Sequence, residues 1–287
     1  MPILYVVATP IGNLGDLSPR AVETLKRVGL IAAEDTRVTI KLLNAHGIRT
    51  PLTSCHEHNE RSKAAQIIRR MLEEDIDVAV TTDAGTPCIS DPGSMLVAEA
   101  ASAGIEVAAV AGPTAMAAAL SVSGMQIEEF TFFGFLPRQK SELRAKLLEM
   151  ARRSKIAVVH ESPHRVAGLL ACVREALPNT RVSASCDLTK KHECTLRGPV
   201  EEVLAALEQN PNAEKGEYCV VLEWSAGDLP TPETPAAGLS LEARLFEGLV
   251  NGLSLRDSMD ALLARGERKN AVYAAGLQVK RLMGTEL

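Results

Sequence analysis

Four apolar runs in the first part of the chain end in short polar turns that are rich in Gly and Pro. The runs are residues 3–8, 30–33, 78–82 and 105–111. The turns that follow them are residues 9–12, 34–37, 83–87 and 112–114. In open α/β sheets, ligands bind beyond the carboxyl ends of the strands, where loops and helix N-termini meet. We therefore expect these turns to form one binding edge for a polar small molecule.

Three acids and one guanidinium group in these turns could take part in acid–base chemistry. Glu34 and Asp35 are adjacent and are followed by Arg37, and Asp83 opens the sharpest turn. A carboxylate can orient or deprotonate a hydroxyl group, and a guanidinium can bind a phosphate. A purely structural interpretation is also open, because acids are common in the first turn of a helix and as caps of tight turns. His160, at the end of a later apolar run, fits a core position better than an acid–base role.

The spacing of the His and Cys residues does not predict a metal site. His56 and His58 have the spacing of a metal-binding pair, and Cys186, His192 and Cys194 form a second loose group. Neither group has enough further ligands close to it for a stable site. No metal is therefore expected.

Two common nucleotide-binding motifs are missing from the first turn. Residues 9–16 contain neither G-x-G-x-x-G nor G-x-x-x-x-G-K-[ST]. Those glycines and that lysine hold the phosphates in Rossmann dehydrogenases and in P-loop NTPases. The sequence therefore disfavours both classes of protein.

The composition is that of an ordinary globular protein. The chain has 287 residues, of which 46% are apolar and 23% are charged, with 31 Lys and Arg against 36 Asp and Glu. Such a chain can bury a sizeable core and is not disordered. Its net charge of −5 and its few aromatic residues (Phe 5, Tyr 3, Trp 1) argue against a general nucleic-acid coat that stacks bases.

The sequence predicts a cytoplasmic protein without a membrane segment. No basic region precedes the first apolar run, so no signal peptide is expected. The longest uncharged apolar stretch, residues 107–125, contains Gly, Pro, Thr and Ser and is expected in the core. The six Cys residues include no Cys-x-x-Cys motif and are expected to be free thiols in a reducing compartment.

The apolar periodicity predicts an α/β fold with two domains and a helical C-terminal module. In the first domain, expected over residues 1–120, apolar runs alternate with helical patterns, which is typical of a parallel sheet with helices on both faces. A second α/β domain is expected over 121–225. A Pro-rich linker at 226–240 and a helical module at 241–287 follow it.

Two basic clusters stand out in this acidic chain. Residues 138–155 contain seven Lys or Arg and two Asp or Glu, and residues 265–281 contain five and one. Charge runs of this kind are most often solvated surface. In a chain of net negative charge, they nevertheless favour a polyanionic substrate such as RNA over a small molecule.

Short motifs follow one another in a characteristic order between residues 3 and 224. They are YVVATPIGNLGD (5–16), AEDTR (33–37), DAGTP (83–87), DPG (91–93), GPTA (112–115), GFLP (134–137), ESPHR (161–165), LTKKHE (188–193) and KGE (215–217). Together they resemble the tetrapyrrole-methylase-like superfamily, and most of all its branch that methylates a cytidine 2′-hydroxyl of bacterial small-subunit rRNA. A weaker match follows at 268–273.

The resemblance implies that S-adenosylmethionine binds in a cleft between the two α/β domains, commonly within a homodimer. Matched by motif, the residues expected at the cofactor are Ile11, Gly12, Asp83, Gly85, Thr86, Thr114, Ala115, Glu161 and Gly216. The residues themselves agree with this assignment, because the turns follow neighbouring strands and the backbone amides of a helix N-terminus suit a carboxylate.

The resemblance also implies 2′-O-methylation of a cytidine in 16S rRNA, within an assembled small ribosomal subunit. The residues expected to act in catalysis are Glu34, Asp35 and Arg37, with Lys191 and Glu193 facing them from the second domain. Methyl transfer from a sulfonium requires positioning of the acceptor and a nearby base, but neither a metal nor a covalent intermediate.

Two other functions remain open from the sequence. A methyltransferase of a tetrapyrrole or corrin precursor would share the core fold, although such a substrate requires neither the helical module nor the basic clusters. A non-catalytic RNA-binding module would not require the cofactor turns, which this chain retains.

Overall fold

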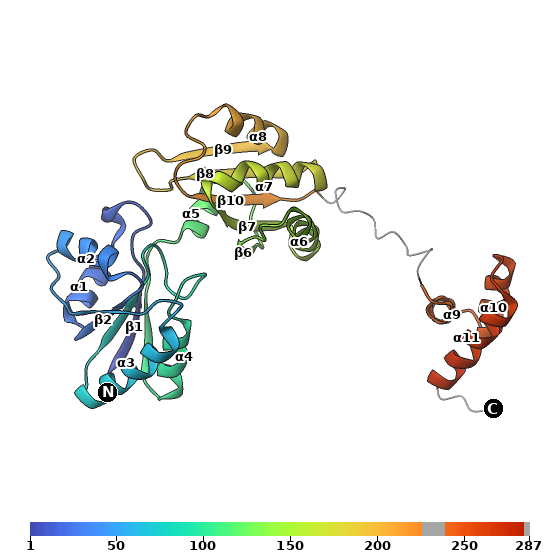
Figure 1. The fold of residues 1–287 in the computed structure, drawn as a ribbon, viewed down its shortest axis with the longest axis horizontal. Helices are drawn as coiled ribbons and strands as arrows, with labels where there is room; N and C mark the ends of the chain where they lie inside the picture. Colours follow the sequence, from blue (N-terminus) through green and yellow to red (C-terminus); the bar gives the residue numbers. More distant parts are fainter. Residues whose placement is uncertain (226–238, 284–287) are drawn as a thin grey trace. The chain divides into compact units, whose positions relative to one another are not determined.

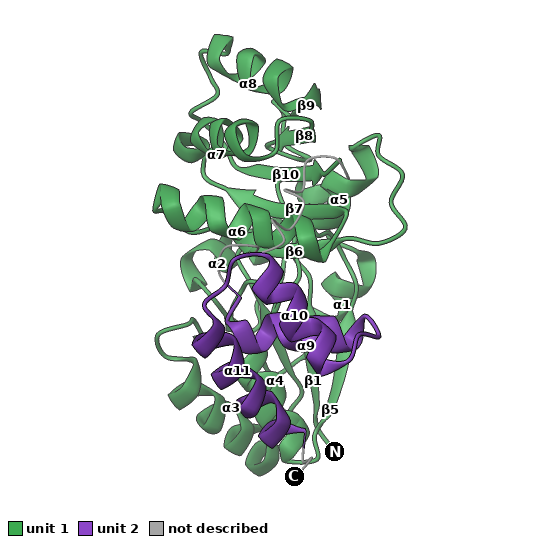
Figure 2. Ribbon diagram, turned by 90° about the vertical axis from the view of Figure 1, so that its right-hand side faces the viewer, with its two compact units in different colours: residues 1–229 green, residues 230–287 purple. Residues whose placement is uncertain are grey.

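The structure is a computed structural model that describes residues 1–225 and 239–283. Its contacts divide the chain into two compact units, residues 1–229 and 230–287, which Figure 2 distinguishes by colour. The larger unit contains two sheets, and the described part of the smaller one is helical (Figure 1). Most of the expected linker, residues 226–238, lies outside the described residues, as do the last four residues of the expected module.

The first sheet is parallel throughout and has the strand order β3-β2-β4-β1-β5. Its strands are β1 (Ile3–Val7), β2 (Leu30–Ala33), β3 (Leu52–Ser54), β4 (Val78–Thr81) and β5 (Glu106–Val110). Because all five run in the same direction, their carboxyl ends lie along one edge of the sheet. The turns that the sequence singled out therefore follow neighbouring strands.

Helices cover both faces of this sheet because its strands supply apolar side chains to both. Ile31 packs in the core formed with α1 and α2, whereas the next residue, Ala32, packs in the core formed with α3 and α4. The helices are α1 (Pro19–Arg27), α2 (Thr36–Ala45), α3 (Glu60–Glu74) and α4 (Ser94–Ser102), and a short 3₁₀ helix, η1 (Leu14–Asp16), follows β1. The side chain of Ser18 caps α1, and Pro19 occupies the first helical position.

The second sheet is mixed and has the order β6-β7-β10-β8-β9. Only the β6–β7 pair is parallel. Its strands are β6 (Thr131–Phe135), β7 (Ile156–Glu161), β8 (Arg181–Cys186), β9 (Cys194–Pro199) and β10 (Tyr218–Glu223). The helices α6 (Lys140–Arg153), α7 (Pro163–Ala176) and α8 (Val200–Gln209) cover one face. The expected α/β fold is confirmed.

The helix α5 (Ala115–Val122) covers the other face of the second sheet. Its Ala119 and Leu120 pack against Val158 of β7 and Val221 of β10. Residue 120, where the first domain was expected to end, thus lies within a helix that packs mainly on the second sheet, with Ile11 of the β1 turn in the same core. The chain passes from one sheet to the other ahead of α5, in the turn that follows β5.

The described part of the smaller unit consists of three helices with a core of their own. They are α9 (Leu241–Val250), α10 (Leu255–Ala264) and α11 (Lys269–Leu282). Leu245, Leu262, Val272 and Val279 are each at most 4% exposed and pack together. Neither unit has, in its described residues, a helix that is long and apolar enough to cross a membrane.

A buried carboxylate holds the backbone between β4 and α4. Glu60, in the first turn of α3, is only 5% exposed. One of its oxygens accepts hydrogen bonds from the amides of Gly93 (2.9 Å) and Met95 (2.7 Å) at the start of α4. The same segment has positive φ angles at the non-glycine residues Cys88 and Ser90. Such angles persist only where the surroundings enforce them, and Glu60 supplies part of that constraint.

We expect Glu60→Ala to lower the free energy of unfolding by about 1–3 kcal/mol, because it leaves backbone donors near α4 without an acceptor. Glu60→Gln keeps an oxygen in the same place and should cost less. Urea denaturation of both variants measures the difference. Equal losses in the two variants would mean that the acceptor oxygen is not what stabilises this segment.

Candidate functional site

A cavity of about 360 Å³ lies where loops of the first sheet meet the second sheet. Its walls come from the turns after β1, β4 and β5 and from β6, β7, β10 and the loop after β8. Six of the nine residues predicted to bind a cofactor line it, namely Ile11, Gly85, Thr86, Thr114, Ala115 and Glu161. Of the other three, Asp83 precedes the lining residue Ala84, and Gly12 and Gly216 lie behind lining side chains.

Gly12 and Gly216 let the backbone approach two charged side chains of the cavity. A Cβ on Gly12 would lie 2.5 Å from Cγ of Lys190, and a Cβ on Gly216 would lie 2.5 Å from Oδ2 of Asp187. Lys190 in turn donates hydrogen bonds to Asp187 Oδ1 (2.8 Å) and Glu217 Oε2 (2.9 Å). The two glycines therefore make room for a lysine that is held between two carboxylates in the cavity wall.

The N-terminus of α5 forms another part of the cavity wall. Thr114 and Ala115, at the start of this helix, both line the cavity. The first amides of a helix have no partner within the helix, and they favour an anion such as a carboxylate. Thr86 donates a hydrogen bond to the carbonyl of Pro113 (3.2 Å) and so ties the β4 turn to this helix start.

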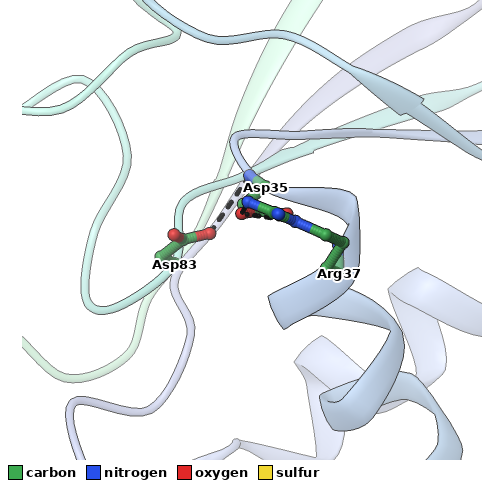
Figure 3. A network of polar contacts seen from close by, with 3 residues as sticks. All are labelled: Asp35, Arg37 and Asp83. Atoms are coloured by element: carbon green, nitrogen blue, oxygen red, sulfur yellow. Dashed lines mark hydrogen bonds and ion pairs between the residues drawn. The ribbon is translucent and has the colours of Figure 1, made fainter.

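The acids at the ends of β2 and β4 form one network. The amide of Asp35 donates to Oδ1 of Asp83 (3.1 Å), and the Asp35 carboxylate binds Arg37, with 2.6 Å between Oδ2 and Nη2 (Figure 3). Glu34 accepts hydrogen bonds from the Thr82 hydroxyl (2.5 Å) and from the Asp83 amide (3.1 Å). The structure thus brings the predicted catalytic group and Asp83 together beside the cavity, although none of them lines it.

The charges in this network differ in their surroundings. The hydrogen bonds from Arg37 lower the pKa of Asp35 to about 2. Burial, and after it the Glu34 carboxylate, raises the pKa of Asp83. The side chain of Arg37 is 88% exposed, so its guanidinium can reach a phosphate of a bound ligand.

Asp91 is an acid that sequence reasoning did not select. It lies in the turn between β4 and α4, and unlike Glu34 and Asp35 it lines the cavity. Burial, and then the charges of Glu34 and Asp83, raise the pKa of Asp91 to about 6. A carboxylate of that pKa accepts a proton more readily than an ordinary aspartate. The sequence does show Asp91 as a second acid in the segment that begins with Asp83, but an acid at that position could equally well cap a turn.

His160 lines the cavity together with two aromatic side chains. Its ring centroid lies 5.1 Å from that of Phe132 and 5.8 Å from that of Phe135, which is 66% exposed. Burial lowers the pKa of His160, so the imidazole is neutral at pH 7. The residue that we expected in the core is therefore part of an apolar wall of the cavity.

Lys191 and Glu193 lie outside the cavity lining. Both are exposed, and the Glu193 carboxylate accepts a hydrogen bond from the amide of Thr189 (2.7 Å). Asp187 and Thr189 have positive φ angles, which turn the loop so that Lys190 points into the site. The lysine of this loop that lines the cavity is thus Lys190, the residue before the predicted Lys191.

The described residues contain no group of three His, Cys, Asp or Glu side chains that could hold a metal ion. The rings of His56 and His58 lie 5.9 Å apart, with no third ligand recorded beside them in the part of the chain that is described. The six Cys residues are free thiols.

Comparison with known proteins identifies the class to which this architecture belongs. The sequence model of the tetrapyrrole (corrin/porphyrin) methylases matches residues 3–204. A ribosomal RNA small subunit methyltransferase I of Pseudomonas aeruginosa is 41% identical over 280 residues, which cover 96% of each chain.

Two solved structures share the fold. A uroporphyrin-III-C-methyltransferase of Thermus thermophilus has a TM-score of 0.53 at 18% identity and covers 78% of this chain and 94% of its own. A diphthine synthase has a TM-score of 0.61 at 12% identity and covers 77% of this chain and 90% of its own.

The two sheets thus have the α/β fold of these two structures. The chain belongs to the tetrapyrrole methylase family, which confirms the resemblance seen in the sequence. It is an enzyme, a methyltransferase that uses S-adenosylmethionine.

The cavity suits S-adenosylmethionine in size and in chemistry. Its volume lies within the range of roughly 300–1,000 Å³ that is usual for small-molecule sites. Apolar walls such as Phe132 and Ile11 suit an adenine ring. The carboxylates of Glu161 and Asp187, although paired with Arg165 and Lys190, can also accept hydrogen bonds from ribose hydroxyls. The helix start at Ala115 suits the methionine carboxylate.

We expect Gly216→Ala to weaken S-adenosylmethionine binding about tenfold or more, because the new Cβ displaces Asp187 and with it Lys190. Gly104→Ala is a matched control: both glycines have positive φ angles, +84° and +74°, but a Cβ on Gly104 would meet nothing within 4 Å. Both variants should lose stability by about 1–2 kcal/mol from backbone strain, and only the first should lose affinity in calorimetry. A loss of affinity of the same size in both would contradict the role given to Asp187 and Lys190.

Proposed function

We propose that this chain methylates the ribose 2′-hydroxyl of a cytidine in small-subunit (16S) rRNA. The observation that carries the proposal is the extent of the match with the Pseudomonas aeruginosa relative. It spans 280 residues and so continues into the C-terminal helices, well beyond residue 204, where the match to the family model ends. The proposal includes 16S rRNA in an assembled small ribosomal subunit as substrate, a cytoplasmic location and a homodimer.

The cavity residues are proposed to hold the cofactor. Ile11, Gly85, Thr86, Thr114, Ala115 and Glu161 would contact it directly. Gly12 and Gly216 would act through Lys190 and Asp187, which they allow to approach. Asp83 would shape the β4 turn through its contact with Asp35 rather than reach the cofactor itself.

S-adenosylmethionine supplies an electrophilic methyl group on its sulfonium, so the chain must align the ribose hydroxyl and remove its proton. We propose that Asp91, which lines the cavity and has a pKa of about 6, is the base that accepts this proton. Glu34 and Asp83 act on Asp91 through their charges, and Arg37 binds a phosphate of the RNA. Alignment of the hydroxyl behind the methyl–sulfonium bond is the other main contribution.

The remaining predicted residues have a weaker claim to catalysis. Asp35 orients Arg37 through hydrogen bonds to both of its carboxylate oxygens, which is a positioning role. Glu193 caps the loop that contains Lys190, and Lys191 is exposed at its tip. We propose that Lys191 contacts RNA phosphate outside the cavity.

The two alternative functions are less well supported. Methylation of a tetrapyrrole or corrin precursor needs only the core that the uroporphyrin-III-C-methyltransferase shares, and that core leaves about a fifth of this chain without a counterpart. A non-catalytic RNA-binding module would not need the cavity, which retains most of the predicted cofactor residues.

Ribose-methylation mapping of rRNA tests the function. Cells that lack this chain should lack one 2′-O-methylcytidine in 16S rRNA, and the wild-type gene should restore it. Purified enzyme and cofactor should add the same methyl to small subunits from those cells. A methyl found on a cytosine ring atom by nuclease digestion and mass spectrometry would overturn the proposed chemistry.

We expect the single-turnover rate to fall about tenfold per pH unit below pH 6, because protonation of Asp91 removes the base. Asp91→Asn should lower the rate about 10²–10⁴-fold and abolish that dependence, with little change in cofactor affinity. Asp75→Asn, at the exposed C-terminal end of α3 and outside the cavity lining, serves as the control. An unchanged pH profile in Asp91→Asn would exclude Asp91 as the base.

A further inference from the structure

The C-terminal unit has a strongly uneven distribution of charge. Residues 265–281 contain five Lys or Arg and a single acid, Glu267. Glu267 is engaged within the unit by an ion pair with Arg244 of α9. The only acid of this segment is thereby drawn toward the core of the unit, and the positive charges remain at the surface of α11 and of the turn before it.

Helix α11 presents a stripe of four exposed side chains at intervals of four residues. The stripe consists of Lys269, Tyr273, Leu277 and Arg281, of which Tyr273 is 51% exposed and Leu277 61% exposed. Residues four apart lie above one another on the surface of a helix. The two cations are therefore separated by about 18 Å along the helix, with an aromatic ring between them.

The packing of α11 fixes the direction in which this stripe faces. Val272, Ala275 and Val279 are buried in the core of the unit. A Cβ on Gly276 would lie 2.8 Å from Sδ of Met259, so this glycine lets α10 approach closely. The buried face is thus committed to α10 and α9, and the stripe is left on the outer face of the unit.

The other basic cluster of the sequence, residues 138–155, contains several cations that form ion pairs. Several of its cations are engaged by acids of the same domain, through the ion pairs Lys140–Glu175, Lys146–Glu149, Arg153–Glu149 and Lys155–Glu223. Charges already paired on the surface contribute less to binding of a polyanion. The two clusters look alike in sequence, but the structure favours the C-terminal one as a binding surface.

The comparisons separate the C-terminal unit from the methylase core. The family model ends at residue 204, and the two solved structures of the fold leave about a fifth of this chain unmatched. The relative whose name specifies ribosomal RNA is aligned across most of the C-terminal helices. The unit is therefore an addition to the core in a protein whose proposed substrate is RNA.

We infer that the stripe on α11, together with Arg268 at the start of the helix, is an RNA-binding surface. The cations at its two ends bind phosphates of the RNA backbone, and Tyr273 stacks on an unpaired base between them. This inference rests on the proposed function and names the surface by which the substrate is held.

The test measures binding of the full-length enzyme to 16S rRNA transcribed in vitro and to small subunits from cells that lack the chain. Lys269→Glu with Arg281→Glu should weaken binding at least about tenfold and should lower the slope of log K against log salt by about 1.4–1.8, since each lost phosphate contact contributes roughly 0.7–0.9. Tyr273→Ala should weaken binding about five- to hundredfold without changing the slope, and Tyr273→Phe should bind like the wild type.

The control is Lys26→Glu with Arg256→Glu, which makes the same change in net charge at exposed positions on α1 and α10. It should bind RNA and cofactor like the wild type, and the stripe variants should keep their affinity for S-adenosylmethionine. Stripe variants that match the control would overturn the inference, as would a loss confined to self-association in light scattering. A wild-type enzyme that binds the cofactor but neither binds nor methylates rRNA would instead overturn the proposed function.

Discussion

The backbone between β4 and α4 is held in a conformation that its own residues do not favour, and the site depends on that restraint. Thr9 and Gly85 exchange hydrogen bonds of 2.8 and 3.1 Å and so join the β1 and β4 turns. Glu34 holds the start of the segment through Thr82, and Glu60 holds its end at the first turn of α4. With both ends fixed, the middle presents Asp91 and its neighbours to the cavity.

The acids at this edge show how far environment alone separates chemically identical groups. Asp35, paired with Arg37, has its pKa lowered to about 2, whereas burial and neighbouring charges raise that of Asp91 to about 6. The first is a permanent anion that orients a guanidinium, and the second can exchange a proton near neutral pH. A difference of this kind is what allows one cluster of carboxylates to combine a structural and a chemical role.

The α/β fold and the edge that carries the cavity could be predicted because they follow from periodicity: buried strands such as Leu30–Ala33 show as apolar runs, and their turns follow directly. The short strand β3 has too few residues to show a periodic pattern. The sequence of α5 does not indicate which sheet this helix covers, because the strands before and after it, β5 and β6, are both rich in apolar residues. Single side chains in loops were the least predictable. The positive φ angles at Asp187 and Thr189 direct Lys190, rather than Lys191, into the cavity, and nothing in the spacing LTKKHE indicates this.

The cavity takes its walls from segments as far apart in the chain as Ile11 and Cys219. No short fragment of the larger unit therefore contains the whole cavity, and a ligand that fills the cavity binds the native state alone. Mass action then links ligand and fold: a cofactor present at a hundred times its dissociation constant stabilises the native state by about 2.7 kcal/mol. The cellular concentration of the methyl donor thus affects the lifetime of this protein as well as its catalytic rate. Without bound cofactor, a larger fraction of the chains is unfolded and open to proteases.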